Sequence, residues 1–289
     1  MKPDRITQLA QKYVEYDMIS TYTELPELPV PRVRLLYTFL KNQEKAKARA
    51  GETCALAAFL VQLGLDTHDR IDVGDSAKDE RAMRSRQLKV LAGDYFSGVF
   101  YDLLAQEEQI DTVSAMSTAI CEVNRLKVRL YTGLKKMLLP AEEYLKECVQ
   151  LKMTLFLSFS RHLDKSVQNI WSLLLAELSR CEVMLDEMKY SAESPPDRKG
   201  YAFLRIWETG TNEDREIIAG NKIGEREWNS LLSKYNIREQ LAAMLRQSAE
   251  RVQHLVQECH GDKIRDELSG ILEPITAILS GHRRAWQEG

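Results

Sequence analysis

The chain has 289 residues, of which 44% are hydrophobic and 29% are charged, and only 14 glycines and 8 prolines punctuate it. This length can bury a sizeable core in one large domain or two ordinary ones, and the scarcity of helix-breaking residues favours long helices over many short strands. Acids and bases are well mixed and give a net charge of −3, so the chain lacks the basic footprint of a nucleic-acid-binding protein.

The cysteines and the apolar segments bear on the cellular compartment. Five cysteines lie far apart without a CxxC pair, which suggests neither a zinc ribbon nor a disulfide framework. The first residues lack the apolar core of a signal peptide. The longest uncharged run, between Glu52 and Asp66, is shorter than the roughly 20 residues that span a bilayer. We therefore expect a reduced, cytoplasmic, soluble protein without a transmembrane segment.

Helical spacing begins near the N-terminus, where Ile6, Leu9, Tyr13 and Val14 recur on one face. A connector over residues 20–31 contains three prolines, which break the helix, and it is too short to be a free linker. The apolar segments that follow predict helices over residues 35–40, 53–71, 84–106, 110–137, 141–163 and 166–190.

A second break, residues 191–200, contains Pro195 and Pro196. After it come an aromatic-containing segment, a polar stretch with several glycines, and amphipathic helices near residues 237–259 and 262–282. No stretch alternates like a strand, and no repeat of fixed period is visible. We therefore predict an all-α fold, a single large helical bundle of about ten or more helices in one domain spanning residues 1–289.

A long apolar helix ends in an acidic cluster. Asp66, Asp69 and Asp72 are spaced i, i+3, i+6 and form a gently turning acidic row, while His68 precedes Asp72 by about one turn. Carboxylates in this place can hold Mg²⁺, which can bridge to diphosphate oxygens. Acidic side chains destabilise a helix C-terminus, which favours a role for this cluster other than helix stability. The alternative is a solvated surface cluster in which Arg70 neutralises one carboxylate.

The second informative feature is RQLKVLAGDYFSGVFYDLL, which begins at Arg86. Gly93, Ser97 and Gly98 are small residues inside this helical pattern, and each glycine costs roughly 1 kcal/mol relative to alanine. The usual reason for such residues is the close approach of another helix. Asp94 falls inside the apolar run and would need a partner if buried. The pattern predicts a tightly packed, buried helix.

Together the two features resemble the trans-prenyl diphosphate synthases. That family has an aspartate-rich motif, DDxxD, on one helix and a V-L-x-G-D-Y/F pattern on a later one. Here HDRID, residues 68–72, and VLAGDYF, residues 90–96, stand at these places. LDTHD followed by RQLxVLAGDYFSG is most similar to the small, non-catalytic subunit family of bacterial two-component heptaprenyl diphosphate synthases, component 1, and EVNRLKVRLY, residues 122–131, is similar as well. The specific resemblance covers about residues 55–131.

The resemblance implies a fold, a partner and a role. It implies the all-α bundle of the isoprenoid synthases and a heterodimer with a catalytic large subunit of the same fold. The complex would extend farnesyl diphosphate with isopentenyl diphosphate to supply the menaquinone side chain, with Mg²⁺ bound mainly by the catalytic partner. This chain would be needed for activity and product-length control, and it would be inactive alone.

Departures from the family pattern decide the expected role. His68 replaces the first aspartate of DDxxD, and imidazole is a poor ligand for Mg²⁺. Asp69 and Asp72 remain in register as weak candidate metal ligands. The nearest candidate for the family's second aspartate-rich motif, LDEMKY with Asp186 and Glu187, lacks the third carboxylate. Because Mg²⁺ held by both motifs stabilises the departing diphosphate in the family, we expect no catalytic residue in this chain.

Residues four and five before the first motif point into the elongation cavity in related synthases, and here they are Gly64 and Leu63. The resemblance makes them product-length candidates, although Gly64 is as well explained as a packing glycine. Arg86, Gly93 and Asp94 are the family-like residues of the following helix.

Two other functions remain open at this point. The chain could be a self-sufficient Mg-dependent prenyl diphosphate synthase that uses His68, Asp69 and Asp72, or a helical scaffold that kept the fold and lost prenyl chemistry. A metal site at His254 and Cys259 matches no standard zinc spacing and lacks a fourth ligand.

Overall fold

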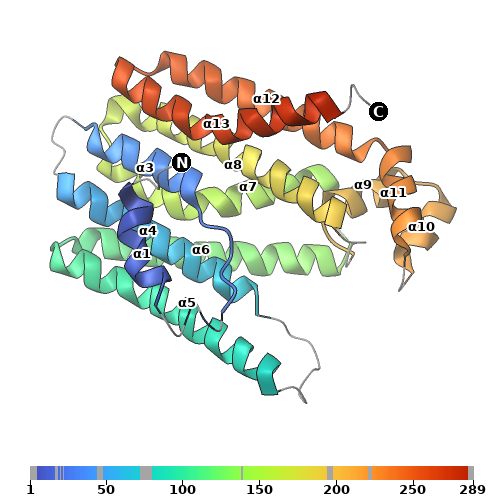
Figure 1. Ribbon diagram of the computed structural model, residues 1–289, viewed down its shortest axis with the longest axis horizontal. Coiled ribbons are helices and arrows are strands. Elements are labelled where there is room, and N and C mark those ends of the chain that lie inside the picture. The colour runs from blue at the N-terminus through green and yellow to red at the C-terminus, as the bar shows by residue number, and fades with distance from the viewer. Residues whose placement is uncertain are drawn as a thin grey trace. The chain divides into compact units, whose positions relative to one another are not determined.

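The residues that the computed structural model describes are 5–16, 19, 21, 23–43, 48–71, 80–137, 139–193, 198–220 and 223–285. Within them the chain is helical and contains no strand, which confirms the predicted all-α fold (Figure 1). The helices are α1 (Arg5–Val14), α3 (Val30–Lys41), α4 (Ala48–Asp69), α5 (Glu80–Gln106), α6 (Ile110–Lys135), α7 (Ala141–Leu157), a 3-10 helix (Ser158–His162), α8 (Lys165–Glu193), α9 (Tyr201–Thr209), α10 (Asn212–Ala219), α11 (Glu225–Lys234), α12 (Ile237–Glu258) and α13 (Asp262–Ala285).

Local signals explain where the helices differ from the prediction. α3 begins at Val30, inside the predicted connector, because Pro31 lies in its first turn, where the missing N–H removes no helical hydrogen bond. The polar stretch with several glycines contains α10 and α11. α10 starts at a capping box, in which Thr211 Oγ1 accepts a hydrogen bond from the backbone N–H of Asp214 at 3.2 Å.

The helices group into two compact units. One unit comprises residues 1–119 and 155–168, and the other comprises residues 120–154 and 169–289. Helices α6, α7 and α8 each contribute to both units. The single domain expected from the sequence stays a prediction. Among the described residues, none of the helices combines the length and the apolar composition that crossing a membrane requires.

The core of the first unit is organised around α4. Every residue of this helix from Cys54 to Leu65 is buried, and α1, α3 and α5 pack against it. A helix that is apolar on all sides is stable in water only when other elements surround it. α5 differs, because Leu91 is 62% exposed and Tyr101 is 47% exposed. The prediction that the VLAGDYF helix is buried is therefore wrong for its outer side.

α4 and α5 run side by side (Figure 1) and approach closely at two glycines. A Cβ atom on Gly64 would lie 2.7 Å from Ser97 Oγ and 2.9 Å from the carbonyl oxygen of Gly93. A Cβ atom on Gly93 would lie 2.6 to 2.8 Å from three atoms of the His68 ring. The close helix approach predicted from the small residues is thus confirmed at Gly93. Gly98 differs, because a Cβ atom there would meet no atom of the described residues within 4 Å.

In the second unit, Asp214 joins α10 to the end of α11. Its Oδ2 atom accepts hydrogen bonds from Thr211 Oγ1 at 2.8 Å, from Lys234 Nζ at 2.7 Å and from the hydroxyl of Tyr235. These donors, with Lys234 foremost, hold the pKa of the Asp214 carboxyl far below its ordinary value. The side chain is buried, so the network fixes the two short helices against each other.

We predict that Gly64→Ala lowers the free energy of unfolding by about 1–3 kcal/mol, because the new methyl group meets the Gly93 carbonyl, which cannot rotate away. Chemical denaturation followed by circular dichroism measures the change. Gly98→Ala is the matched control, since its methyl group enters open space and helix propensity should raise stability by up to about 1 kcal/mol. Equal effects of the two substitutions would contradict the close crossing.

We further predict that Asp214→Asn destabilises the protein at pH 7 and that this difference narrows as the pH falls below about 4. A carboxyl with a lowered pKa in the folded state contributes stability above its unfolded pKa and loses it on protonation. Urea denaturation at several pH values tests this. Glu250→Gln, at an exposed position of α12, serves as the control. A difference that does not change with pH would rule out the charged network as the cause.

Candidate functional site at the crossing of α4 and α5

The two motifs found in the sequence meet where α4 crosses α5. The imidazole of His68, near the end of α4, lies over Gly93, and its Nε2 atom is 3.3 Å from Asp94 Oδ1. The His68 side chain is 34% exposed and that of Asp94 is 65% exposed. The structure therefore brings together the buried Gly93, the half-buried His68 and the exposed Asp94. Asp94, which the sequence placed inside an apolar run, has both solvent and an imidazole as partners.

Asp69 and Asp72 are the candidate metal ligands of the first motif. Asp69 is the last residue of α4 and is exposed. Asp72 lies outside the described residues. In the part of the chain that the structure describes, no three His, Cys, Asp or Glu residues are grouped so that they could hold a metal ion. Metal binding by Asp69 and Asp72 therefore stays a prediction.

Basic side chains lie at the end of α4. Arg70 Nη1 donates a hydrogen bond to the carbonyl oxygen of Leu25 at 3.4 Å, which ties the helix end to the preceding connector. Lys89 Nζ, on α5, donates to the carbonyl oxygen of Arg70 at 3.1 Å. A cation at the C-terminal carbonyls of a helix is favourable. Arg86, the first family-like residue of α5, is half-buried.

A buried polar chain runs from α3 to the acidic end of α4. Arg32 is 3% exposed, and its Nη1 atom donates to Gln62 Oε1 at 3.2 Å. Gln62 Nε2 then donates to Asp66 Oδ1 at 2.8 Å. The Arg32 guanidinium also lies 5.0 Å from the centre of the Phe156 ring, a cation–π geometry. Asp66, which is half-buried, thus belongs to a hydrogen-bonded network that the sequence did not predict, and the glutamine one turn before it was the available signal.

The product-length candidates, Leu63 and Gly64, both lie inside α4. Leu63 is fully buried. The space beside Gly64 is filled by α5, through Ser97 Oγ and the carbonyl oxygen of Gly93. Gly64 therefore packs against a helix of its own chain, and a role of these two residues in product length stays a prediction.

Glu187, in the candidate second motif on α8, is 7% exposed. Its Oε1 atom accepts a hydrogen bond from the Tyr144 hydroxyl at 2.7 Å, and its Oε2 atom accepts one from the backbone N–H of Tyr201 at 2.7 Å. Burial raises the pKa of Glu187, and the two hydrogen bonds oppose that shift. Gly200, with a φ of 87°, lets the chain turn close to this carboxylate. Glu187 therefore joins α7, α8 and the start of α9.

Asp186 has a different partner. Lys152 Nζ, on α7, is 2.9 Å from Asp186 Oδ2 and 3.7 Å from Glu182 Oε2. A metal ion at this motif would have to displace an ammonium group from Asp186 and the Tyr144 hydroxyl from Glu187. The two carboxylates serve separate structural contacts, so their contacts do not fit a shared Mg²⁺ ion, which prefers near-octahedral oxygen ligation.

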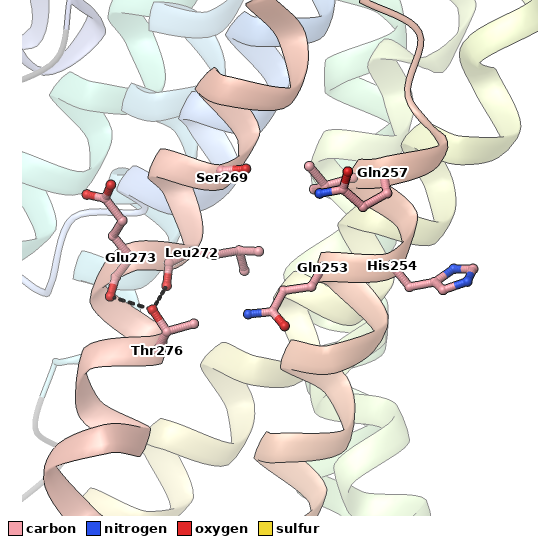
Figure 2. Close-up of a pocket in the computed structure, with 8 residues that line it drawn as sticks. Gln253, His254, Gln257, Ser269, Leu272, Glu273 and Thr276 are labelled. Carbon is pink, nitrogen blue, oxygen red and sulfur yellow. Dashed lines mark hydrogen bonds between the residues drawn. The ribbon is translucent and has the colours of Figure 1, made fainter. Parts of the chain in front are cut away.

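A groove of about 450 Å³ lies between α12 and α13 (Figure 2). Its lining mixes apolar side chains with polar ones, among them Gln253, Gln257, Ser269 and Thr276. The Thr276 hydroxyl donates to carbonyl oxygens of its own helix, those of Leu272 and Glu273. The ring of His254 points away from α13 (Figure 2), and its Nδ1 atom is 3.1 Å from Glu258 Oε1. The groove therefore presents no arrangement with an evident chemical role.

Solved prenyl diphosphate synthases share the architecture described above. The heptaprenyl diphosphate synthase of Staphylococcus aureus gives a TM-score of 0.71 at 11% identity, covering 94% of this chain and 96% of that one. The geranylgeranyl pyrophosphate synthase of Lactobacillus brevis gives 0.71 at 14% identity, covering 93% and 94%. A polyprenyl synthase of Roseobacter denitrificans gives 0.68 at 14% identity, covering 93% of each chain. The chain therefore has the all-α isoprenoid synthase fold.

The sequence comparisons then give the family. A family profile described as heptaprenyl diphosphate synthase (HEPPP synthase) subunit 1 matches residues 16–194. The heptaprenyl diphosphate synthase component 1 of Geobacillus stearothermophilus is 44% identical over 80 residues, which make up 28% of this chain and 34% of that protein. The chain belongs to the heptaprenyl diphosphate synthase subunit 1 family, and the resemblance seen in the sequence is confirmed.

We predict that Glu187→Ala lowers the free energy of unfolding by about 2–4 kcal/mol, because it leaves the Tyr144 hydroxyl and the Tyr201 N–H without their acceptor. Asp186→Ala, one residue away, is the control and should cost no more than about 1 kcal/mol, because that side chain is 55% exposed. Denaturation midpoints compare the two variants. Equal losses of stability in the two variants would show that the hydrogen bonds of Glu187 stabilise the fold no more than the Asp186 ion pair does.

Proposed function

We propose that this chain is the non-catalytic subunit of a heterodimeric, medium-chain trans-prenyl diphosphate synthase of the heptaprenyl type. It is needed for activity and for product-length control, and it is inactive alone. The complex joins isopentenyl diphosphate to farnesyl diphosphate and supplies the menaquinone side chain. Membership in a family described as a subunit 1 supports a second component.

The observation that carries the proposal is the His68–Asp94 pair at the place of the aspartate-rich motif. Mg²⁺ prefers hard oxygen ligands, and the metal must stabilise charge on a departing diphosphate. The leading position here holds an imidazole, whose Nε2 atom is directed at a carboxylate of the same chain, 3.3 Å away. Residue 68 therefore offers Mg²⁺ no oxygen ligand, and the Asp94 carboxylate is already paired with the imidazole.

The second candidate motif supports the same conclusion. Glu187 is buried and accepts two hydrogen bonds, and Asp186 is paired with Lys152. Neither described carboxylate is arranged for a metal, so we assign Mg²⁺ binding mainly to the catalytic large subunit. The five cysteines are free thiols, which fits the reducing cytoplasm that we propose for the complex.

We predict that isopentenyl diphosphate is incorporated onto farnesyl diphosphate only when this chain and the second component are mixed. Labelled isopentenyl diphosphate, added with Mg²⁺ to each component alone and to the mixture, measures this, and the product length is read from the same reaction. Turnover by this chain alone would instead support the self-sufficient enzyme. Failure to associate with any prenyl synthase component would support the helical scaffold.

A matched pair of substitutions separates a supporting role from a catalytic one. Asp69→Ala in this chain should reduce turnover of the mixture less than alanine at an aspartate of the partner's aspartate-rich motif. The reason is that Asp69 stands beside an imidazole rather than a second carboxylate. Equal losses in the two components would count against a non-catalytic chain.

A further inference from the structure

The two described aspartates of the acidic row at the end of α4 have different surroundings. Asp69 is exposed, whereas Asp66 is half-buried. Asp66 Oδ1 accepts a hydrogen bond from Gln62 Nε2 at 2.8 Å, and Gln62 itself is only 6% exposed. Because residues four apart lie on the same side of a helix, the row passes from the buried glutamine through Asp66 toward solvent. One carboxylate oxygen of Asp66 is therefore held on the buried side of this row.

The side-chain amide of Gln62 has an orientation that its two partners dictate. A guanidinium group only donates hydrogen bonds and stays charged, so the oxygen end of the amide must face Arg32, whose Nη1 atom lies 3.2 Å from Gln62 Oε1. The NH₂ end, which can only donate, then faces the Asp66 carboxylate. Gln62 thus connects a cation at one end to an anion at the other, and both of its hydrogen bonds are charge-assisted.

Arg32 is held firmly at its end of this connection. The residue is 3% exposed, and its guanidinium lies 5.0 Å from the centre of the Phe156 ring, which is fully buried. Burying a charged group is unfavourable unless it is paired and hydrogen-bonded, so the Arg32 guanidinium favours every arrangement that keeps its acceptor in place. The buried arginine therefore fixes Gln62, and Gln62 in turn fixes Asp66.

These contacts do not fit a divalent cation at the acidic row. Mg²⁺ prefers near-octahedral oxygen ligation, so a metal ion there would need the carboxylates of the row as ligands. Recruiting Asp66 Oδ1 would break its bond to Gln62 and leave a buried NH₂ group without an acceptor, which is unfavourable. His68 offers no oxygen in its place, because its side chain is an imidazole.

We propose that the buried Arg32–Gln62 pair withholds the Asp66 carboxylate from metal binding at the end of α4. This inference deepens the proposed function and rests on it, because it names residues that keep a divalent cation away from this chain. Two separate features then weaken the acidic row. An imidazole stands at residue 68, and a buried cation acts through an amide on Asp66.

Arg32→Met combined with Gln62→Leu tests the withholding. The double variant replaces the buried polar pair by apolar side chains, so no buried charge is left unpaired, and circular dichroism should show wild-type helicity. Asp66 then loses its donor and can turn toward solvent beside Asp69. Titration of the isolated full-length chain with Mn²⁺, followed by the electron paramagnetic resonance signal of the free ion, should give a dissociation constant at least about ten-fold below that of the wild type, because the row gains a carboxylate ligand.

Gln62→Glu provides a second test that keeps Arg32 paired. The new carboxylate accepts from the guanidinium in the same place, offers Asp66 no donor and repels it, so the same gain in Mn²⁺ affinity is expected. Adding Asp66→Asn to either variant should remove the gain. An Mn²⁺ affinity that stays at the wild-type level in both variants overturns the inference, and so does a gain that persists without the Asp66 carboxylate.

The outcomes separate this inference from the function on which it rests, because the Mn²⁺ titration needs neither prenyl substrates nor the second component. Unchanged Mn²⁺ affinity in the variants, together with prenyl transfer only in the mixture of components, overturns the role of Arg32 and Gln62 alone. Prenyl transfer by the isolated wild-type chain with Mg²⁺ overturns the proposed function, and the withholding of Asp66 fails with it.

Discussion

The close crossing of α4 and α5 is the constraint on which the rest of the first unit depends. The middle of α4 is buried on all sides, and α5 packs against it. The two helices approach so closely that a Cβ atom at the contact would clash. Gly64 and Gly93 lie at this contact. Side chains between two helices this close have little room for other rotamers, because protein interiors are close-packed and resist expansion.

That crossing also determines where the His68 side chain lies. The His68 ring lies against Gly93 of α5, and its Nε2 atom is 3.3 Å from Asp94 Oδ1. The HDRID and VLAGDYF segments are therefore joined by a contact within the chain. The His68 side chain thus connects the end of α4 to α5.

In the second unit, acidic side chains of α8 likewise make contacts that hold helices together. Glu187 accepts hydrogen bonds from α7 and from the first residue of α9, and Asp186 pairs with Lys152. Burying a carboxylate is unfavourable unless hydrogen bonds compensate, and two donors compensate here.

Periodicity and short motifs are local properties of the chain, so the helical class and the family could both be predicted from the sequence alone. The sequence could not distinguish Gly93 from Gly98, Asp66 from Asp69, or Asp186 from Glu187, since each pair has similar chemistry and nearby positions. Only the tertiary structure decided which glycine faces a helix and which carboxylate is buried. Those differences depend on residues distant in sequence, such as Arg32 and Tyr144, that folding brings into contact.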